Sequence, residues 1–286
     1  MSPPDFYAWL LDPHRRPLVM GVLNVTPDSF SDGGRFASID AAVERARAMA
    51  AEGADLIDVG GESTRPGSQR VDAAEQLRRL LPVLRALRGR LDSTTLSVDT
   101  TLAPVAEAAL GEGVHVVNDI SAGRDDAALL PLVARRGGPL VLMHMQGTPA
   151  TMQVAPTYSD VTAEVAAFLR ARLSAAEAAG VDPARVLLDP GIGFGKTVEH
   201  NLSLLRRTGD LAALGRPLVV GTSRKGFIGK VLADGSADGG ADRRFGTAAT
   251  VAWAVANGAA IVRVHDVGPM AQVVRMMRAI SRGSVR

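Results

Sequence analysis

Cationic side chains stand directly after several short apolar runs of this sequence, where they could bind an anion. Lys225, Arg263 and His265 are charged or can become charged, and side chains of this kind bind phosphate groups in proteins. Asn24 and the backbone N–H groups of residues 60–61 add hydrogen-bond donors and an oxygen that can bind a metal. Together these residues suit an anion, and a diphosphate especially.

A second set of residues suits a flat heterocycle. Asp99, Asn118 and Asp189 also follow apolar runs, and Asp and Asn side chains can match a ring that carries N–H donors and C=O acceptors, such as a pterin. A carboxylate that accepts two N–H donors from an aminopyrimidinone would be fixed in the plane of that ring. Phe194 and Met143 could pack on the face of such a ring.

Eight short β-rich runs carry these side chains at their ends. Several of the runs are almost continuously apolar, which is typical of parallel strands that are buried on both faces of a sheet. The predicted strands cover residues 18–25, 55–61, 94–100, 115–121, 139–145, 186–190, 217–223 and 261–267.

Helical patterns separate the runs. Asp72 precedes an apolar stripe, and Glu75 follows it three residues later, which resembles a capping box. Pro82 interrupts that stripe and predicts a kink or a division of the helix. Other apolar positions at helical spacing lie within residues 39–49, 161–173, 251–255 and 270–280, and the methionines among them are expected to fill the core.

Strands that alternate with helices fit a closed barrel or a doubly wound open sheet. The count of eight favours a single (β/α)8 TIM barrel, so we predict one α/β domain over residues 1–286 with a core from about 18 to 280. Trp9 and Leu10 are expected to pack across the end of the barrel away from the active site.

The C-terminal strand ends of such a barrel form the active site. Taken alone, an Asp after a strand is typical of a helix N-cap, and His144 is typical of a structural histidine. Polar residues at all eight ends instead indicate one shared cavity. The polar loops of residues 26–35 and 63–69 follow the first two strands and could close over a substrate, whereas residues 233–242 are expected to form a mobile surface loop.

Two nucleotide-binding patterns are rejected. Gly195-Lys196-Thr197 resembles the end of a P-loop, but Pro190 occupies the position of its first glycine. Gly191, Gly193 and Gly195 do not have the spacing of the dinucleotide fingerprint, and they follow the sixth strand rather than the first.

Composition excludes further classes of protein. The chain has no cysteine, which excludes disulfides, thiolate metal sites and cysteine nucleophiles. Its net charge is +2 and it has no long run of Lys and Arg, so nucleic-acid binding is not expected. The sequence shows no signal-peptide pattern and no apolar stretch of membrane-spanning length. We therefore expect a cytoplasmic protein that does not associate with membranes.

Two long segments resemble signatures of the dihydropteroate synthase family. They are GVLNVTPDSFSDGG at residues 21–34 and DLIDVGGESTRPGS at residues 55–68. The shorter blocks LSVDT, VNDIS, LMHMQGTP, DPGIGFGKT, GTSRKGFIG and RVHDV follow in the same order. The resemblance covers about residues 18–280.

The resemblance implies a Mg²⁺-dependent transferase of folate biosynthesis. Such an enzyme condenses (7,8-dihydropterin-6-yl)methyl diphosphate with 4-aminobenzoate, releases diphosphate, and is the target of sulfonamides. The family is a TIM barrel and usually a homodimer. Two alternatives are a non-catalytic pterin-binding paralogue, which should lack the two closing loops, and a pterin-dependent methyltransferase, which has no need of the diphosphate-binding residues.

The resemblance also assigns roles to residues. Asn24 would bind Mg²⁺, and the helix start at residues 223–227 would receive the carboxylate of 4-aminobenzoate. Asp99, Lys225, Arg263 and His265 are the predicted catalytic residues. The predicted substrate-binding residues are these four together with Phe30, Ser63, Thr64, Arg65, Pro66, Asn118, Met143, Asp189, Phe194, Gly221 and Ser223.

Overall fold

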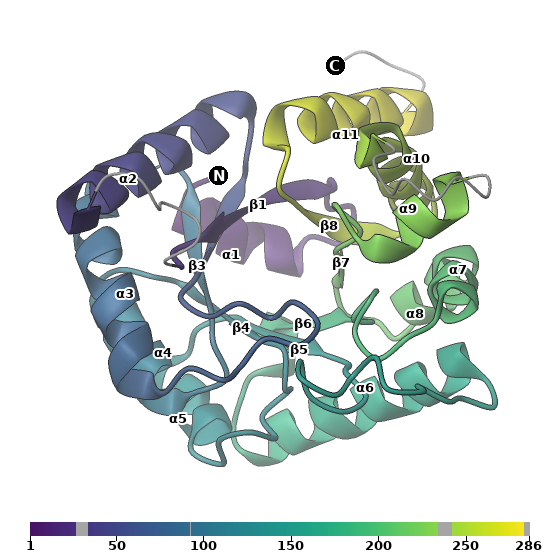
Figure 1. Cartoon of the computed structure of the whole chain (residues 1–286), viewed down its shortest axis with the longest axis horizontal. Coiled ribbons are helices and arrows are strands. Elements are labelled where there is room, and N and C mark those ends of the chain that lie inside the picture. Colours follow the sequence, from purple (N-terminus) through teal and green to yellow (C-terminus); the bar gives the residue numbers. More distant parts are fainter. Residues whose placement is uncertain (27–33, 92, 234–241, 283–286) are drawn as a thin grey trace.

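The apolar runs form eight parallel strands that close into a barrel in the computed structural model (Figure 1), which confirms the predicted TIM barrel. Neighbouring strands pair in sequence order, and β1 pairs with β8 to complete the ring. The structure describes residues 1–26, 34–91, 93–233 and 242–282. The strands are β1 Leu18–Asn24, β2 Leu56–Gly60, β3 Thr95–Asp99, β4 Val116–Asp119, β5 Leu140–Met143, β6 Val186–Asp189, β7 Leu218–Val220 and β8 Ala259–Val264.

The helices surround the strands, except for the first one, which lies across one end of the barrel (Figure 1). They are α1 Pro3–Leu11, α2 Gly34–Glu52, α3 Ala73–Leu87, α4 Ala103–Gly111, α5 Leu129–Arg136, α6 Val161–Ala178, α7 Val198–Arg206, α8 Thr208–Ala212, α9 Gly226–Leu232, α10 Arg243–Ala256 and α11 Val267–Arg282, with a short 3₁₀ helix at Pro183–Arg185. Phe30 and most of the two predicted loops 26–35 and 233–242 lie outside the described residues.

The strands end one to three residues earlier than the sequence predicted. The last strand shows the largest difference, because it begins at Ala259 and ends at Val264, while Val267 already starts α11. The last polar residues of the strands, such as Asp99 and Asp189, still belong to the backbone ladder, and the residues that follow them turn into the loops above the barrel. The apolar runs therefore located the strands correctly but included the first loop residues as well.

The register of the strands brings polar ends to one level of the barrel. Asn24 pairs with Gly60, Gly60 with Asp99, and Asp99 with Asn118. On the other side of the ring, Met143 pairs with Asp189. Since parallel strands point the same way, this register gathers the predicted site residues above the same end of the barrel.

The opposite end of the barrel is closed by α1. Phe6, Trp9 and Leu10 pack with Leu18 and Met20, which lie inside the barrel. This confirms the predicted position of Trp9 and Leu10, and α1 lies across the far end of the barrel in Figure 1. The N-terminal end of the barrel is therefore filled by side chains rather than open to water.

The third helix differs in two respects from its prediction. Asp72 is the N-cap and accepts a hydrogen bond from the backbone of Glu75, but the Glu75 side chain pairs with Arg78 and Arg79 instead of completing a capping box. Pro82 lies inside one continuous helix, so it does not divide it. Burial of the leucine and valine side chains around Pro82 offsets the lost hydrogen bond, which costs about 3 kcal/mol in a helix interior.

The last helix buries only part of its apolar stripe. Met270 and Val274 are buried, as predicted, but Met276 and Ile280 are 62% and 61% exposed. The stripe is therefore buried at Met270 and Val274 but exposed at its last residue, Ile280, whereas Met276 lies beside the predicted stripe. Among the described residues, no helix combines the length and the apolar character needed to cross a membrane.

Truncation of Phe6 tests the closure of the barrel by α1. The Phe6 side chain is completely buried, so Phe6→Ala should lower the free energy of unfolding by about 3–5 kcal/mol. Urea denaturation measures this change. Leu11→Ala on the same helix is the control, because Leu11 is 69% exposed and its loss should change stability by less than about 0.5 kcal/mol. Equal effects of the two substitutions would contradict the role of α1.

Candidate active site

A cavity of about 1180 Å³ opens above the C-terminal ends of the strands. Its wall contains every predicted site residue that the structure describes, and Phe30 is the one that lies outside the described residues. The lining includes Asn24, Ser63, Thr64, Arg65, Pro66, Asp99, Asn118, Met143, Asp189, Phe194, Gly221, Ser223, Lys225, Arg263 and His265. The structure thus brings residues from all parts of the chain into one pocket.

Arg263 links three strands at the floor of this cavity. Its Nε donates to Asp58 Oδ2 at 2.7 Å, and its Nη2 donates to Asp99 Oδ2 at 2.8 Å. Asn118 Nδ2 donates to the same Asp58 oxygen at 2.8 Å. Asp58 is completely buried, and the side chains of Asp99 and Arg263 are 10% and 19% exposed. Charge-assisted hydrogen bonds of this kind hold the planar guanidinium in one orientation.

Asp58, on β2, is a site residue without a predicted role. Its carboxylate is the second partner of Arg263, and one of its oxygens, Oδ1, is buried without a hydrogen-bond partner. The sequence does contain a sign of this role. Asp58 is a charged residue inside the second apolar run, and its burial costs free energy unless a partner offsets it. That partner, Arg263, is 205 residues away in the sequence, so only the fold reveals the pair.

Burial shifts the two aspartates of the floor towards their neutral forms. Burial raises the pKa of Asp99 to about 7, against the opposing effect of Arg263, and the nearby Asp58 adds to the rise. Burial also raises the pKa of Asp189, whose Oδ1 accepts a hydrogen bond from Gly191 N at 2.7 Å. Carboxylates in this environment bind N–H donors of a ligand strongly, because such donors restore the stabilisation lost with water.

Lys225 lies at the cavity wall above Phe194. Its Nζ is 4.1 Å from the centroid of the Phe194 ring, and burial, followed by repulsion from Arg263, lowers the pKa of Lys225 to about 8. Gly193 has a positive φ of 84°, and a Cβ there would lie 2.9 Å from Lys225 Cδ. Glycine at residue 193 therefore leaves room for the lysine stem beside the loop that follows β6.

His265 is oriented by Ser223. The Nδ1 atom of His265 is 3.2 Å from Ser223 Oγ, and the His265 backbone N–H donates to the same oxygen at 3.1 Å. Burial and the charge of Arg263 lower the pKa of His265 to about 3. The imidazole is thus neutral at physiological pH in the free protein, so the positive charge of the cavity comes from its lysines and arginines, Arg263 and Lys225 among them.

Lys196 is a site residue that the sequence analysis missed. It lines the cavity and is 2% exposed, and its Nζ lies 2.9 Å from both His144 Nδ1 and the carbonyl oxygen of Phe194. Burial lowers the pKa of Lys196 to about 7 and that of His144 to about 3, so the neutral imidazole can accept from the lysine. These contacts of Lys196 fix the loop that carries the Phe194 ring. The P-loop pattern, in which Lys196 was considered and rejected, could not indicate this role.

The described residues contain no cluster of three or more His, Asp or Glu side chains that could hold a metal ion by themselves. Asn24 offers one side-chain oxygen at the cavity wall, beside Gly60. Mg²⁺ commonly keeps several waters and binds one or two protein oxygens together with substrate phosphates. The donor set around Asn24 therefore fits a magnesium ion that arrives with a phosphorylated ligand, rather than a metal caged by the protein alone.

Known proteins share both the sequence pattern and the fold of this chain. The family model described as "Pterin binding enzyme" matches residues 20–265. The dihydropteroate synthase of Synechocystis sp. is 47% identical over 273 residues, which cover 96% of this chain and 93% of that protein.

Two solved structures are similar along almost the whole chain. The dihydropteroate synthase of Xanthomonas albilineans with 4-aminobenzoic acid has a TM-score of 0.85 and 44% identity, and the match covers 93% of both chains. The dihydropteroate synthase of Yersinia pestis, solved as a sulfonamide drug complex, has a TM-score of 0.86 and 42% identity over 93% of this chain and 95% of that one.

The raised pKa of Asp99 predicts a pH-dependent effect of Asp99→Asn on stability. The native protein binds the Asp99 proton more tightly than the unfolded chain, where the pKa is about 3.9. The stability that Asp99 contributes is therefore fully present below about pH 4 and is lost as the pH rises through about 7. Asp99→Asn is neutral at every pH, so its stability relative to the wild type should increase between pH 4 and pH 7.

Chemical denaturation of the wild type and of Asp99→Asn over this pH range measures the difference between their free energies of unfolding. This difference should change by at most about 1.4 kcal/mol for each pH unit between the pKa values of the unfolded and the native protein. Glu107→Gln is the control, because Glu107 lies in an exposed ion pair on α4. A difference between wild type and Asp99→Asn that stays constant with pH would show that the Asp99 pKa is not raised.

Proposed function

The chain belongs to the family of pterin-binding enzymes, and we propose that it catalyses the dihydropteroate synthase reaction in folate biosynthesis. It condenses (7,8-dihydropterin-6-yl)methyl diphosphate with 4-aminobenzoate and releases 7,8-dihydropteroate and diphosphate. The observation that carries this function is one cavity that combines buried carboxylate and amide groups at its floor with cationic groups beside them, in a chain 47% identical to a dihydropteroate synthase over nearly its whole length.

The floor of the cavity suits the pterin. Asp99, Asn118 and Asp189 present carboxylate and amide groups, which match the N–H and C=O edge of an aminopyrimidinone. Asp189 is held by Gly191 N and offers its second oxygen to the ligand. Met143 and the Phe194 ring belong to an apolar cluster at this end of the barrel, and the ring of the ligand can pack against them.

The diphosphate is assigned to the cationic side of the cavity. Arg263 and Lys225 supply positive charge, and the neutral His265 can donate one hydrogen bond. Asn24 would hold Mg²⁺ together with the diphosphate, and the bound ion would offset the negative charge of the leaving group. Thr64 on the β2–α3 loop reaches the same space.

The mechanism follows from these positions. As the bond between the pterin methylene carbon and the diphosphate oxygen breaks, positive charge on that carbon spreads into the conjugated ring, and the carboxylates of Asp99 and Asp189 stabilise it. Arg263 stabilises the departing oxygens, while its hydrogen bonds to Asp58 and Asp99 keep it in place before the reaction. The arylamine nitrogen then forms the new bond to carbon and loses one proton, which the released diphosphate or water can accept. No side chain needs to become covalently attached to the pterin.

The pocket for 4-aminobenzoate is assigned to the β2–α3 loop and the start of α9. Ser63, Thr64, Arg65 and Pro66 line the cavity, and Ser223, which precedes α9, lines it as well. A sulfonamide that mimics 4-aminobenzoate would occupy the same space. Phe30 stays a predicted member of this pocket.

The resemblance also implies a cytoplasmic homodimer. Exposed apolar side chains on two adjacent helices support the dimer, since Phe245 and Trp253 on α10 and Met276 and Ile280 on α11 are each more than half exposed. The two helices lie side by side in Figure 1. Apolar side chains of this size gathered at a surface are typical of an interface between protein chains.

Product formation tests the proposed reaction. Purified protein with the pterin diphosphate, labelled 4-aminobenzoate and Mg²⁺ should form labelled dihydropteroate, and EDTA should abolish the product. Asp99→Asn should lower kcat/KM on the order of 100-fold, since it removes a charged hydrogen-bond partner of the ligand. Glu107→Gln should match the wild type.

The outcome separates the alternatives. Pterin binding by calorimetry without any product would refute the synthase function and support a non-catalytic pterin-binding protein. A covalent pterin adduct detected by mass spectrometry during turnover would refute the proposed mechanism but not the reaction.

Charged substitutions on α11 test the dimer. The double variant Met276→Glu with Ile280→Glu should sediment as a monomer where the wild type sediments as a dimer, because two buried carboxylates without partners oppose association. Leu11→Glu, an exposed position on α1, should leave the dimer intact. A monomeric wild type, or a dimeric double variant, would contradict this interface.

A further inference from the structure

The segment between β2 and α3 is tied to two neighbouring loops by Arg70. Its Nη1 donates to Thr101 Oγ1 at 3.0 Å, and its Nη2 forms an ion pair with Asp125. Thr101 follows β3, and Asp125 lies on the loop between β4 and α5. Arg70 thus connects the loop that lines the cavity with residues 63–66 to the rim of two further strands.

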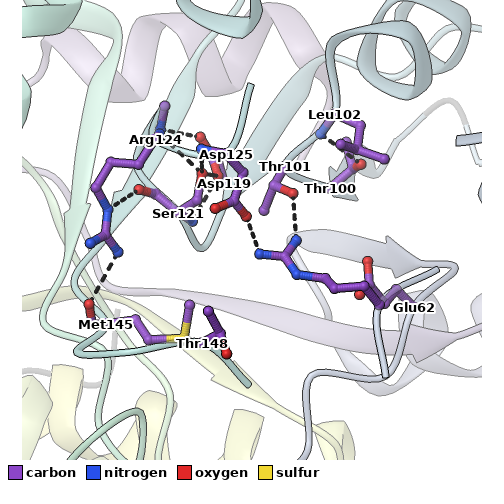
Figure 2. Close-up of polar contacts among 12 residues, drawn as sticks. Glu62, Thr100, Thr101, Leu102, Asp119, Ser121, Arg124, Asp125, Met145 and Thr148 are labelled. Carbon is purple, nitrogen blue, oxygen red and sulfur yellow. Dashed lines mark hydrogen bonds and ion pairs between the residues drawn. The ribbon is translucent and has the colours of Figure 1, made fainter. Parts of the chain in front are cut away.

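The surface that receives Arg70 is itself ordered by hydrogen bonds. Figure 2 shows Asp125, Asp119 and Ser121 close together beside Thr101. The backbone N–H of Asp125 donates to Ser121 Oγ at 3.2 Å, and Ser121 Oγ donates to Asp119 Oδ1 at 2.7 Å. Asp119 is completely buried, and Thr101 is 3% exposed. Arg70 therefore binds to a fixed part of the fold.

The other end of the same loop is fixed at Glu62. Its carboxylate accepts hydrogen bonds from Val71 N at 3.3 Å and from Gln76 Nε2 at 2.8 Å, and Gln76 is completely buried. Between these two anchors, Gly67 N donates to Pro149 O at 3.0 Å on the loop that follows β5. Residues 63–66 therefore line the cavity between the contacts of Glu62 on one side and those of Gly67 and Arg70 on the other.

The Arg70–Asp125 pair is poorly suited to a role in global stability. Its side chains are 41% and 27% exposed, and ion pairs at that exposure contribute little to the free energy of unfolding. Its geometric effect is larger, because the loop that it holds contributes Ser63, Thr64 and Arg65 to the cavity wall. Binding groups on a loop act effectively only when their position is fixed to within a fraction of an ångström.

We propose that Arg70 is a positioning residue that holds residues 63–66 in the geometry that receives 4-aminobenzoate. This inference rests on the proposed function, which assigns that substrate to the β2–α3 loop. The pterin-facing residues Asp99, Asn118 and Asp189 stand on strand ends and are held by the barrel. Loosening of the loop therefore weakens the binding of the second substrate and leaves that of the pterin unchanged.

Steady-state kinetics of Arg70→Met and Asp125→Asn test the proposal. Each variant should raise the KM for 4-aminobenzoate about tenfold, within the range that a misplaced binding group causes, and should change the KM for the pterin diphosphate less than about twofold. The double variant should be no worse than Arg70→Met alone, because both changes remove the same contact. Arg136→Met is the matched control, since Arg136 forms a similar exposed pair with Glu107 away from the cavity.

Hydrogen exchange supplies a measurement that does not depend on turnover. The amide groups of Gly67 and Val71 should exchange faster in Arg70→Met than in the wild type, while amides of the strands keep their rates. Unchanged exchange at these amides, or an unchanged KM for 4-aminobenzoate in an active Arg70→Met, would overturn the proposal. An equal rise in both KM values, or a lowered Tm with global loss of protection, would show a merely structural role and overturn it as well.

The two proposals fail in different ways. A wild-type protein that makes no dihydropteroate would refute the proposed function and, with it, the substrate assigned to this loop. A wild-type protein that makes product, together with variants that bind 4-aminobenzoate normally, would refute only the role of Arg70.

Discussion

The hydrogen-bonded group of Arg263, Asp58 and Asp99 is the interaction on which the rest of the site depends. A guanidinium and two carboxylates at the floor of the barrel are costly to remove from water, and their close contacts at 2.7 and 2.8 Å offset that cost. The three side chains come from β8, β2 and β3, so they meet only when the barrel is closed. Closure of the fold and assembly of the charged floor are therefore one event, and the charges of the site are already oriented before any substrate binds.

The sequence predicts most of the fold because two simple patterns coincide. Apolar runs mark the eight strands, and the polar residues that follow them, among them Asp99 and Asp189, mark the end of the barrel that holds the cavity. The ends of the strands were predicted less well, because the polar residues after each apolar run, such as Thr222 and Ser223, were counted with the strand although they lie in the loops. Roles that arise only from distant partners could not be predicted. Asp58, Lys196 and Arg70 each depend on a contact with another element of the barrel, and no local pattern contains that information.

The site combines a rigid part with parts that are held more loosely. The floor is built from strand ends, whose backbone is fixed by the ladder on both sides. The mouth is built from loops, which are fixed by a few side-chain contacts such as those of Arg70 and Lys196. This division fits the proposed reaction with two substrates, in which strand ends hold the larger heterocycle and loops receive the smaller arylamine.

The closed lower end of the barrel has a kinetic consequence. Because Phe6 and Trp9 fill the N-terminal end, the described residues leave the cavity accessible from the C-terminal side of the barrel, where Thr64 and Arg65 line it. A molecule bound at the floor is covered by the next one to enter, so the occupant of the floor must bind first and leave last. With the pterin at the floor, as the proposed function assigns it, this architecture favours an order in which the pterin binds first and dihydropteroate, which still carries that ring, leaves last.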